Sequence, residues 1–224
     1  MKIKLLSAVC FFTSALCLLT SYITFGQYIK LYDFGSNPND GQTPYGTLIS
    51  DGTFLYGMTG NGGTNTKGNI FKIKPDGTGF ANLLDFSGVT NGSYPQGSLI
   101  SDGTFLYGMT NMGGTNDLGT IFKIMPDGTG YVKLLDFAGV ANGSFPYGSL
   151  ISDGTFFYGM TYGGGTGGSG TIFKIMPDGT GYAKLLDFAG PTNGSEPYGS
   201  LISDGTFLYG MTSLGGTGSS GTIF

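Results

Sequence analysis

Several residue types that build common catalytic sites are absent from this chain. Its 224 residues include no histidine, arginine or tryptophan, and the only two cysteines, Cys10 and Cys17, lie near the N-terminus. Beyond its N-terminal region the chain therefore has no side chains for a Ser-His-Asp triad, a cysteine nucleophile or a typical zinc or copper site. A D-x-D-x-D-G calcium loop is also missing. The sequence therefore predicts no metal site and no cofactor, with calcium held by loop carbonyls and turn aspartates as the alternative.

Positive charge is scarce as well. Beyond residue 26 the chain carries eight lysines and fourteen acidic residues, which gives a net charge of −6. An acidic chain without arginine is poorly suited to bind nucleic acid or an anionic membrane through a basic patch. We therefore expect no nucleic-acid partner.

The first 26 residues have the composition of a secretory signal peptide. Two lysines precede an apolar run over 5–23, and the small residues Thr24 and Gly26 stand at the positions that a signal peptidase reads. Cleavage before Gln27 leaves a mature chain without cysteine and without a membrane span. An uncleaved membrane anchor is the alternative, since the apolar run is nearly long enough to cross a bilayer. We predict a protein that is secreted or held at the cell surface.

Glycine and proline are abundant, and both follow a strict period. Proline returns every 51 residues and opens nearly the same string each time, G-S-L-I-S-D-G-T-F-L-Y-G-M-T, then G-T-I-F-K-I-M-P-D-G-T-G-Y and L-L-D-F. A fixed period near fifty residues indicates one supersecondary unit that is repeated along the chain. We therefore assign residues 27–224 to a single repeat domain. Its copies begin at Pro44, Pro95, Pro146 and Pro197.

Each copy contains four short apolar runs separated by turn signals, which is typical of a small antiparallel sheet. The second run is apolar on both faces, so we expect it to lie in a sheet packed between other sheets. The fourth run is more polar, as suits an outer edge. Sheets of this kind at this period predict an all-β fold, a β-propeller with about four blades of four antiparallel strands. In the second copy the runs are 97–101, 104–110, 120–125 and 131–137, with a two-residue hairpin at Asp102-Gly103.

The two ends of the repeat domain allow two interpretations of how the blades form a ring. Residues 28–34 match the fourth run without the rest of a copy, and the last copy reaches Phe224 within its third run. In one interpretation the N-terminal strand 28–34 completes the C-terminal blade and closes a four-bladed ring. In the other, the chain is a fragment of a larger propeller.

The string P-x-G-S-L-I-S-D-G-T-F-L-Y-G-M-T-x-x-G-G-T, followed by G-T-I-F-K-I-x-P-D-G-T-G-Y, resembles the GloVer repeat of exported bacterial proteins. The resemblance covers residues 28–224, and it implies a β-propeller-like fold and export from a bacterial cell. Many such choice-of-anchor repeat proteins carry a separate C-terminal sorting or anchoring segment, and this sequence departs from that pattern. The family has no established activity, so the resemblance implies no catalytic residues.

Differences between the copies gather in two kinds of loop. The copies that begin at Pro95 and Pro146 differ at eleven of 51 positions, five in the loop between runs two and three and four around the connection between copies. These loops leave an up-and-down sheet at the same end, so the variation predicts one variable face, where binding residues usually lie. Drift of unconstrained loop tips, and packing of the aromatic rings between blades, are the alternatives. The candidate binding residues on this face are Tyr45, Tyr147, Tyr162, Tyr198, Asn111 and Asp117.

Most acidic residues recur at the same place in every copy, where turn chemistry explains them. Asp40, Asp117 and Glu196 are each unique to one copy. Most glycosidases cleave their substrate with a pair of such carboxyl groups. The three acids are the candidates for a catalytic role, and solvated surface charge is the alternative.

The sequence thus favours an exported, non-enzymatic β-propeller that binds an extracellular glycan or protein through its variable face. A carbohydrate-active enzyme that uses the three loop acids is the first alternative. A structural component of the cell envelope or matrix is the second.

Overall fold

The computed structural model describes residues 28–37 and 39–224. The predicted signal peptide, residues 1–26, therefore lies outside the described residues. Every regular element in the described part of the chain is a β-strand, and no helix there is long and apolar enough to cross a membrane. The all-β prediction is confirmed.

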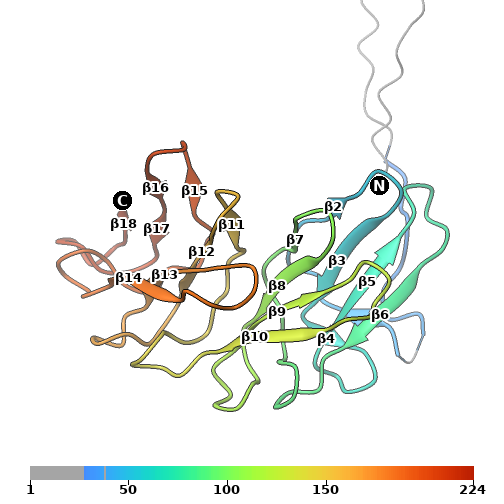
Figure 1. The fold of residues 1–224 in the computed structure, drawn as a ribbon, viewed down its shortest axis with the longest axis horizontal. Helices are drawn as coiled ribbons and strands as arrows, with labels where there is room; N and C mark the ends of the chain where they lie inside the picture. The colour runs from blue at the N-terminus through green and yellow to red at the C-terminus, as the bar shows by residue number, and fades with distance from the viewer. Residues whose placement is uncertain (1–27, 38) are drawn as a thin grey trace, which may run out of the picture.

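Three copies of the repeat form four-stranded antiparallel sheets, blades 1, 2 and 3, as predicted (Figure 1). The strands of each sheet neighbour one another in sequence order. Blade 1 consists of β2 (Ile49–Ser50), β3 (Leu55–Thr59), β5 (Asn69–Ile73) and β6 (Ala81–Asp85). Blade 2 consists of β7 (Ile100–Ser101), β8 (Leu106–Thr110), β9 (Thr120–Ile124) and β10 (Val132–Asp136). Blade 3 consists of β11 (Ile151–Ser152), β12 (Phe157–Thr161), β13 (Thr171–Ile175) and β14 (Ala183–Asp187).

The last copy forms blade 4, in which Gly210 divides the second strand. In this blade β15 (Ile202–Ser203) pairs with β16 (Leu208–Tyr209), and β17 (Met211–Thr212) pairs with β18 (Thr222–Ile223). Gly210 and Phe224 exchange two backbone hydrogen bonds of 3.0 Å, so the two ladders continue one sheet. Two further short strands, β1 (Gly41–Gln42) and β4 (Asn61–Gly62), pair with each other at the end of blade 1.

Residues 28–34 do not form the predicted strand. Tyr32 stacks on Phe80 of blade 1 with 4.0 Å between ring centroids, and Phe34 packs edge-on against Phe71 at 5.0 Å. The phenylalanine that directly follows strand four in blades 1, 2 and 3 packs in a similar way on the next blade. The segment therefore takes the place of a fourth strand in front of blade 1. It is not a strand, because a strand needs a paired edge and the described residues supply none there.

The described chain forms an open arc of blades instead of a closed ring. In Figure 1 the first described residues lie beside blade 1, and the C-terminus lies in blade 4 at the opposite end of the molecule. The interpretation in which residues 28–34 complete the C-terminal blade is therefore wrong, because this segment packs on blade 1.

The hairpin between strands one and two lies one residue later than predicted. The Asp102 N–H donates to the Phe105 carbonyl at 3.3 Å, so the turn centres on Gly103 and Thr104. The Asp102 carboxylate explains the shift, because its Oδ1 accepts hydrogen bonds from the N–H groups of Thr104 and Phe105, each at 2.8 Å. The same contacts recur in the other three blades.

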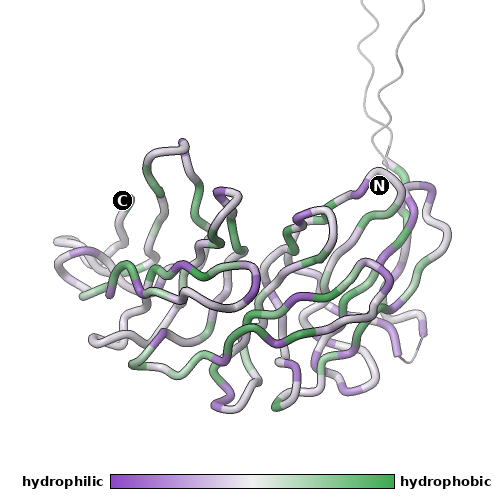
Figure 2. Tube along the Cα trace, viewed as in Figure 1, coloured by the Kyte–Doolittle hydropathy of each residue, from purple (hydrophilic) through white to green (hydrophobic). Residues whose placement is uncertain are grey.

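The hydrophobic core lies between neighbouring blades. Strand two is buried on both faces as predicted, and all five residues of β8 are buried. In Figure 2 the most apolar stretches follow the strands, and the loops at the ends of the blades are mostly neutral or polar. The interface between blades 2 and 3 contains Tyr107, Met109, Ile121, Phe137, Leu150, Phe157, Phe173 and Ile175.

A line of hydrogen bonds joins the blades where strand one begins. The N–H groups of Thr47, Ser98 and Ser149 each donate to the serine hydroxyl at the same position of the next blade, at 2.7–2.8 Å. A Cβ atom on Gly97 would collide with the Gly148 carbonyl, so only glycine allows the two backbones to approach this closely. The residues that precede these glycines are therefore held beside their counterparts in the next blade.

Candidate functional site

The loops between strands two and three and the connections between blades meet on one face, as predicted. We call it the loop face. In blade 2, Ser93 of the incoming connection bridges to Met112 of the loop, and the Asn111 N–H donates to the Tyr94 carbonyl at 3.3 Å. Equivalent bridges recur in blades 3 and 4. The Asp-Gly hairpins turn at the other end of the same strands, so they lie away from the loop face.

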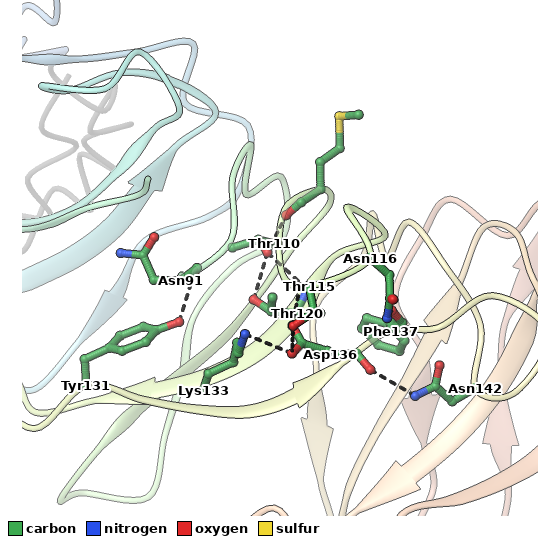
Figure 3. Close-up of polar contacts among 11 residues, drawn as sticks. Asn91, Thr110, Thr115, Asn116, Thr120, Tyr131, Lys133, Asp136, Phe137 and Asn142 are labelled. Atoms are coloured by element: carbon green, nitrogen blue, oxygen red, sulfur yellow. Dashed lines mark hydrogen bonds and ion pairs between the residues drawn. The ribbon is translucent and has the colours of Figure 1, made fainter. Parts of the chain in front are cut away.

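Repeated side chains hold these loops in place (Figure 3). In blade 2, Asp136 accepts hydrogen bonds from the Thr115 N–H at 3.2 Å and hydroxyl at 2.9 Å, and it forms an ion pair with Lys133 at 2.8 Å. Burial alone would raise the pKa of Asp136, but Lys133 and Thr115 outweigh it and hold that pKa below its ordinary value. Asn116 adds a hydrogen bond from its side-chain amide to the Phe137 carbonyl at 2.9 Å. The repeated strand-four acid is thus part of the scaffold.

The connections between blades are tied to the sheets on both sides. The Tyr131 hydroxyl donates to the Asn91 carbonyl at 2.9 Å, and Tyr182 repeats this contact toward Asn142 at 2.7 Å. The Asn142 amide in turn donates to the Asp136 carbonyl at 3.1 Å (Figure 3). A well-connected scaffold therefore carries the variable positions, which is how many binding loops are presented.

The residue before the blade-opening proline has a left-handed backbone in every blade. Its φ is 52° at Thr43, 55° at Tyr94, 57° at Phe145 and 58° at Glu196. Such a conformation costs about 1–3 kcal/mol for a residue with a side chain, so the surrounding packing must impose it. Because four different residues adopt it, the backbone conformation belongs to the repeat and the side chain is the variable part.

Three of the predicted binding tyrosines form one cluster. Tyr147 and Tyr162 of blade 3 pack edge-on with 5.3 Å between their ring centroids. Tyr198 of blade 4 lies 4.6 Å from Tyr147 and 5.1 Å from Tyr162. Tyr147 and Tyr162 are half-buried, whereas Tyr198 is 52% exposed. The cluster forms because Tyr147 and Tyr198 follow equivalent prolines, and the step between blades places these positions side by side.

Glu196 joins the cluster from blade 4. The Tyr162 hydroxyl donates to Glu196 Oε2 at 2.8 Å, and this hydrogen bond, with burial and the negative charge of Glu196, raises the pKa of Tyr162 to about 12. Burial and Tyr198 raise the pKa of Tyr147, while the side chain of Asn111 opposes that rise. Ring contacts and a hydrogen bond therefore connect residues of blades 3 and 4, and Asn111 of blade 2 lies next to Tyr147. We call them the tyrosine site: Asn111, Tyr147, Tyr162, Glu196 and Tyr198.

The other two candidate binding residues, Tyr45 and Asp117, lie outside this group, and Asn111 is its most buried member. Asn111 is only 4% exposed, and its Nδ2 has no hydrogen-bond partner among the described residues. Tyr45 of blade 1 is 61% exposed and lies against Gly60 of its own blade. Asp117 is exposed, and its Oδ1 accepts a hydrogen bond from the Gly113 N–H at 2.9 Å, within its own loop.

The family model described as the Gloeobacter/Verrucomicrobia repeat matches residues 99–224 of the chain. The chain belongs to this repeat family. The whole tyrosine site falls inside the matched range.

Among solved structures, the chain is similar to one from the crystal structure of a nidogen/laminin complex, with 21% identity, a TM-score of 0.51 and coverage of 71% of this chain and 51% of that one. It thus spans about half the length of that chain (51%). A putative TolB from Agrobacterium tumefaciens shows 15% identity and a TM-score of 0.49, over 81% of this chain and 56% of that one. The chain of the nidogen/laminin complex is β-propeller-like, which agrees with the fold. No curated protein matches the chain.

The fold holds the three candidate catalytic acids in separate places. Asp40 is not an open loop residue, because it is 4% exposed and accepts hydrogen bonds from the Tyr32 hydroxyl at 2.8 Å and the Gly41 N–H at 3.1 Å. Asp117 contacts its own loop in blade 2, and Glu196 contacts blade 3. Within residues 28–37 and 39–224 no two of these acids share a partner, and no group of acidic side chains is placed to hold a metal ion.

Comparison of the repeat copies identified Glu196 only as a possible catalytic acid, not as a binding residue. Its position in the repeat could have indicated a binding role. Glu196 immediately precedes a repeat-opening proline and Tyr198 immediately follows it, so both belong to the connection that varies between copies. The contact with Tyr162 was not visible, because it crosses from one blade to the next.

Proposed function

We propose that the protein is an exported, non-enzymatic repeat protein that binds an extracellular glycan or protein through its loop face. One observation carries the proposal. Positions that differ between copies, in two kinds of loop and in three blades, come together in the tyrosine site. Drift of unconstrained loop tips does not account for half-buried rings that contact one another across blades.

The distribution of variation supports the same conclusion. Nine of the eleven differences between the second and third copies lie in loops of the loop face or in the connections that reach it. The side chains that hold these loops, such as Asp136 and its counterpart Asp187, are repeated. A constant scaffold with variable loops is the usual design of a recognition surface.

Export follows from the leader and from the chemistry of the mature chain. The leader has the charged start and apolar run of a signal peptide, and the residues after it contain no cysteine that needs a defined redox state. We therefore propose that the protein acts outside the cytoplasm, secreted or at the cell surface.

A non-enzymatic role fits the placement of the acids. A glycosidase needs two carboxyl groups about 5–10 Å apart on either side of one bond. Asp40, Asp117 and Glu196 belong to three different blades, and Asp40 is buried under hydrogen bonds. We therefore assign the loop face to binding.

The test is a binding screen of the full mature chain against a glycan array and purified extracellular proteins. A loop-face variant carries Tyr147→Gln, Tyr162→Asn and Tyr198→Gln, which introduces the residues that blade 2 has at these positions. A matched hairpin-face control carries Thr→Ala at positions 104, 155 and 206. We expect the loop-face variant to lose binding and the control to retain it. Absence of any ligand, or equal binding by both variants, would overturn the proposal.

A further inference from the structure

We infer that the tyrosine site binds a neutral oligosaccharide, with one sugar ring against Tyr198 and sugar hydroxyls against Glu196. This inference rests on the proposed binding role of the loop face and names the ligand class for one part of it.

The packing of the three rings determines where a ligand lies. Their centroids are 4.6–5.3 Å apart, which is ordinary contact distance between aromatic side chains. The rings therefore fill the space between themselves and leave no cage for a quaternary ammonium group. The remaining surface is the outer side of Tyr198, which is 52% exposed. A ligand with a flat apolar face and polar edges, such as a sugar ring, matches a half-exposed tyrosine ring.

A hydrogen-bond acceptor borders this ring. Tyr162 occupies Oε2 of Glu196, and Oε1 of the same carboxylate accepts no hydrogen bond from the described residues. A carboxylate oxygen without a protein partner accepts a strong hydrogen bond from a ligand hydroxyl. Asn111 is buried on the Tyr147 side of the cluster, so it supports the site and does not face the ligand.

Charge selects against anionic ligands. The tyrosine site contains one carboxylate and no lysine, and an acidic sugar or a phosphate placed there would be repelled by Glu196. Three of the lysines elsewhere in the described residues are engaged by aromatic rings. Those at positions 72, 123 and 174 lie over phenylalanine rings of the hairpins, at the far end of the strands. The site is thus suited to a ligand without negative charge.

The site is also rigid before a ligand arrives. The Glu196 N–H donates to the Ser169 carbonyl at 2.9 Å, its φ is held at 58°, and Pro197 follows directly. Tyr147 and Tyr162 immobilise the ring of Tyr198 on one side. Preorganised aromatic rings lose little conformational entropy on binding, which favours even a weak ligand such as a sugar.

The experiment is calorimetric titration of the mature chain with neutral hexasaccharides, namely cellohexaose, xylohexaose and mannohexaose. Oligogalacturonate, a heparin hexasaccharide and choline are the comparison ligands. Tyr198→Gln is compared with Tyr45→Gln, because both residues follow a repeat-opening proline and only Tyr198 belongs to the site. We expect Tyr198→Gln to weaken the Kd for a neutral hexasaccharide by about tenfold or more. Tyr45→Gln and Tyr198→Phe are expected to change the Kd by less than about twofold.

Two results separate failure of this inference from failure of the proposed function. Preference for an anionic sugar or for choline, or equal effects of Tyr198→Gln and Tyr45→Gln on a ligand that does bind, overturns the inference and leaves a binding role for the loop face intact. Absence of any glycan or protein ligand overturns both. Circular dichroism and thermal melting of each variant confirm that a loss of binding does not reflect unfolding.

Discussion

At the scale of single residues, the pair formed by Tyr162 and Glu196 is the contact that most clearly distinguishes blade 3 from blade 2. Blade 2 has Asn111 at the position of Tyr162, and blade 3 has Phe145 at the position of Glu196, so no other described pair of blades repeats this bond. The backbone that carries Glu196 is the same in all copies. A change of two side chains on a constant backbone thus created a new polar contact between blades.

Removal of the carboxylate from this pair is expected to change how Tyr162 titrates. Its pKa is raised from 10.0 to about 12, because its hydroxyl donates to Glu196 and ionisation would place two negative charges side by side. A raised folded-state pKa stabilises the fold at pH values below 10.0, and this contribution is lost as pH rises through about 12. In Glu196→Gln we expect the pKa of Tyr162 to fall toward 10.0.

The measurement is a ¹³C NMR titration of the tyrosine Cζ atoms, with Tyr162→Phe used to assign the signal. Asp153→Asn is the control, because it removes the carboxylate partner of Tyr158 in the same blade and does not change the partner of Tyr162. An unchanged Tyr162 titration in Glu196→Gln would contradict the geometry of the site.

At the scale of the elements, strand two is the centre of each blade, and its glycine is required by packing. A Cβ atom on Gly108 of β8 would lie 2.7 Å from Phe122 Cζ and 3.1 Å from Leu99 Cδ2. Phe122 is fully buried between Phe86 and Tyr131, so its ring has no free space into which to move. The repeated Gly-Met-Thr of strand two therefore reflects close contact with the phenylalanine of strand three.

Gly108→Ala is expected to destabilise the protein by about 1–3 kcal/mol, the usual cost of overpacking a well-packed core. The control is Gly218→Ala in the loop of blade 4, where an added Cβ meets nothing within 4 Å. That change is expected to alter stability by less than about 0.5 kcal/mol. Urea unfolding followed by tyrosine fluorescence measures both, and equal midpoints for the two variants would refute the packing argument.

At the scale of the whole molecule, each blade is stabilised by its neighbours. The apolar side chains form three clusters, one at each junction between consecutive blades. The outer face of blade 4 shows the consequence. Met211 and Ile223 are 62% and 84% exposed there, whereas their blade 2 counterparts Met109 and Ile121 are buried against blade 3. Proteins built in this way behave as nearly one-dimensional arrays, in which stability depends on repeats and on the interfaces between them.

Phe137→Ala is expected to weaken the junction between blades 2 and 3 in particular. Phe137 is fully buried and packs on Phe173 at 5.6 Å, so its removal should cost about 3–5 kcal/mol. Hydrogen exchange should accelerate first in β9, β10 and β13, which flank this junction, and least in blade 1. Phe207→Ala on the exposed side of blade 4, where the ring is 64% exposed, is the control. Uniform acceleration across all blades would show that the array unfolds as one unit.

Much of the local fold was predictable because it depends on short-range pattern. The second copy was expected to have strands at 104–110 and 120–125, and β8 and β9 lie within those ranges at Leu106–Thr110 and Thr120–Ile124. Strand one was predicted too long, because its first residues contact the next blade through Gly97 and Ser98 instead of pairing with strand two. The hairpin was misplaced because the Asp102 side chain, not the Asp-Gly backbone, organises the turn.

The candidate site was predictable only in part. Variation between copies pointed to the loop face and to Tyr147, Tyr162 and Tyr198, which do lie together. The same reasoning included Tyr45 and Asp117, which the structure places apart from them. The difference arises because residues 51 positions apart become neighbours only across a blade junction, and the nature of both neighbours decides whether they make a contact.

The sequence by itself determined the repeated blade, its buried second strand and the face on which the copies differ, because period, alternation and turn residues act over a few positions. Only the tertiary structure decided that residues 28–34 pack on blade 1 without becoming a strand, since strand formation needs a partner edge. It alone also decided that Asn111, Tyr147, Tyr162, Glu196 and Tyr198 form one site. Their proximity is set by the step from blade to blade, and packing between the blades fixes that step.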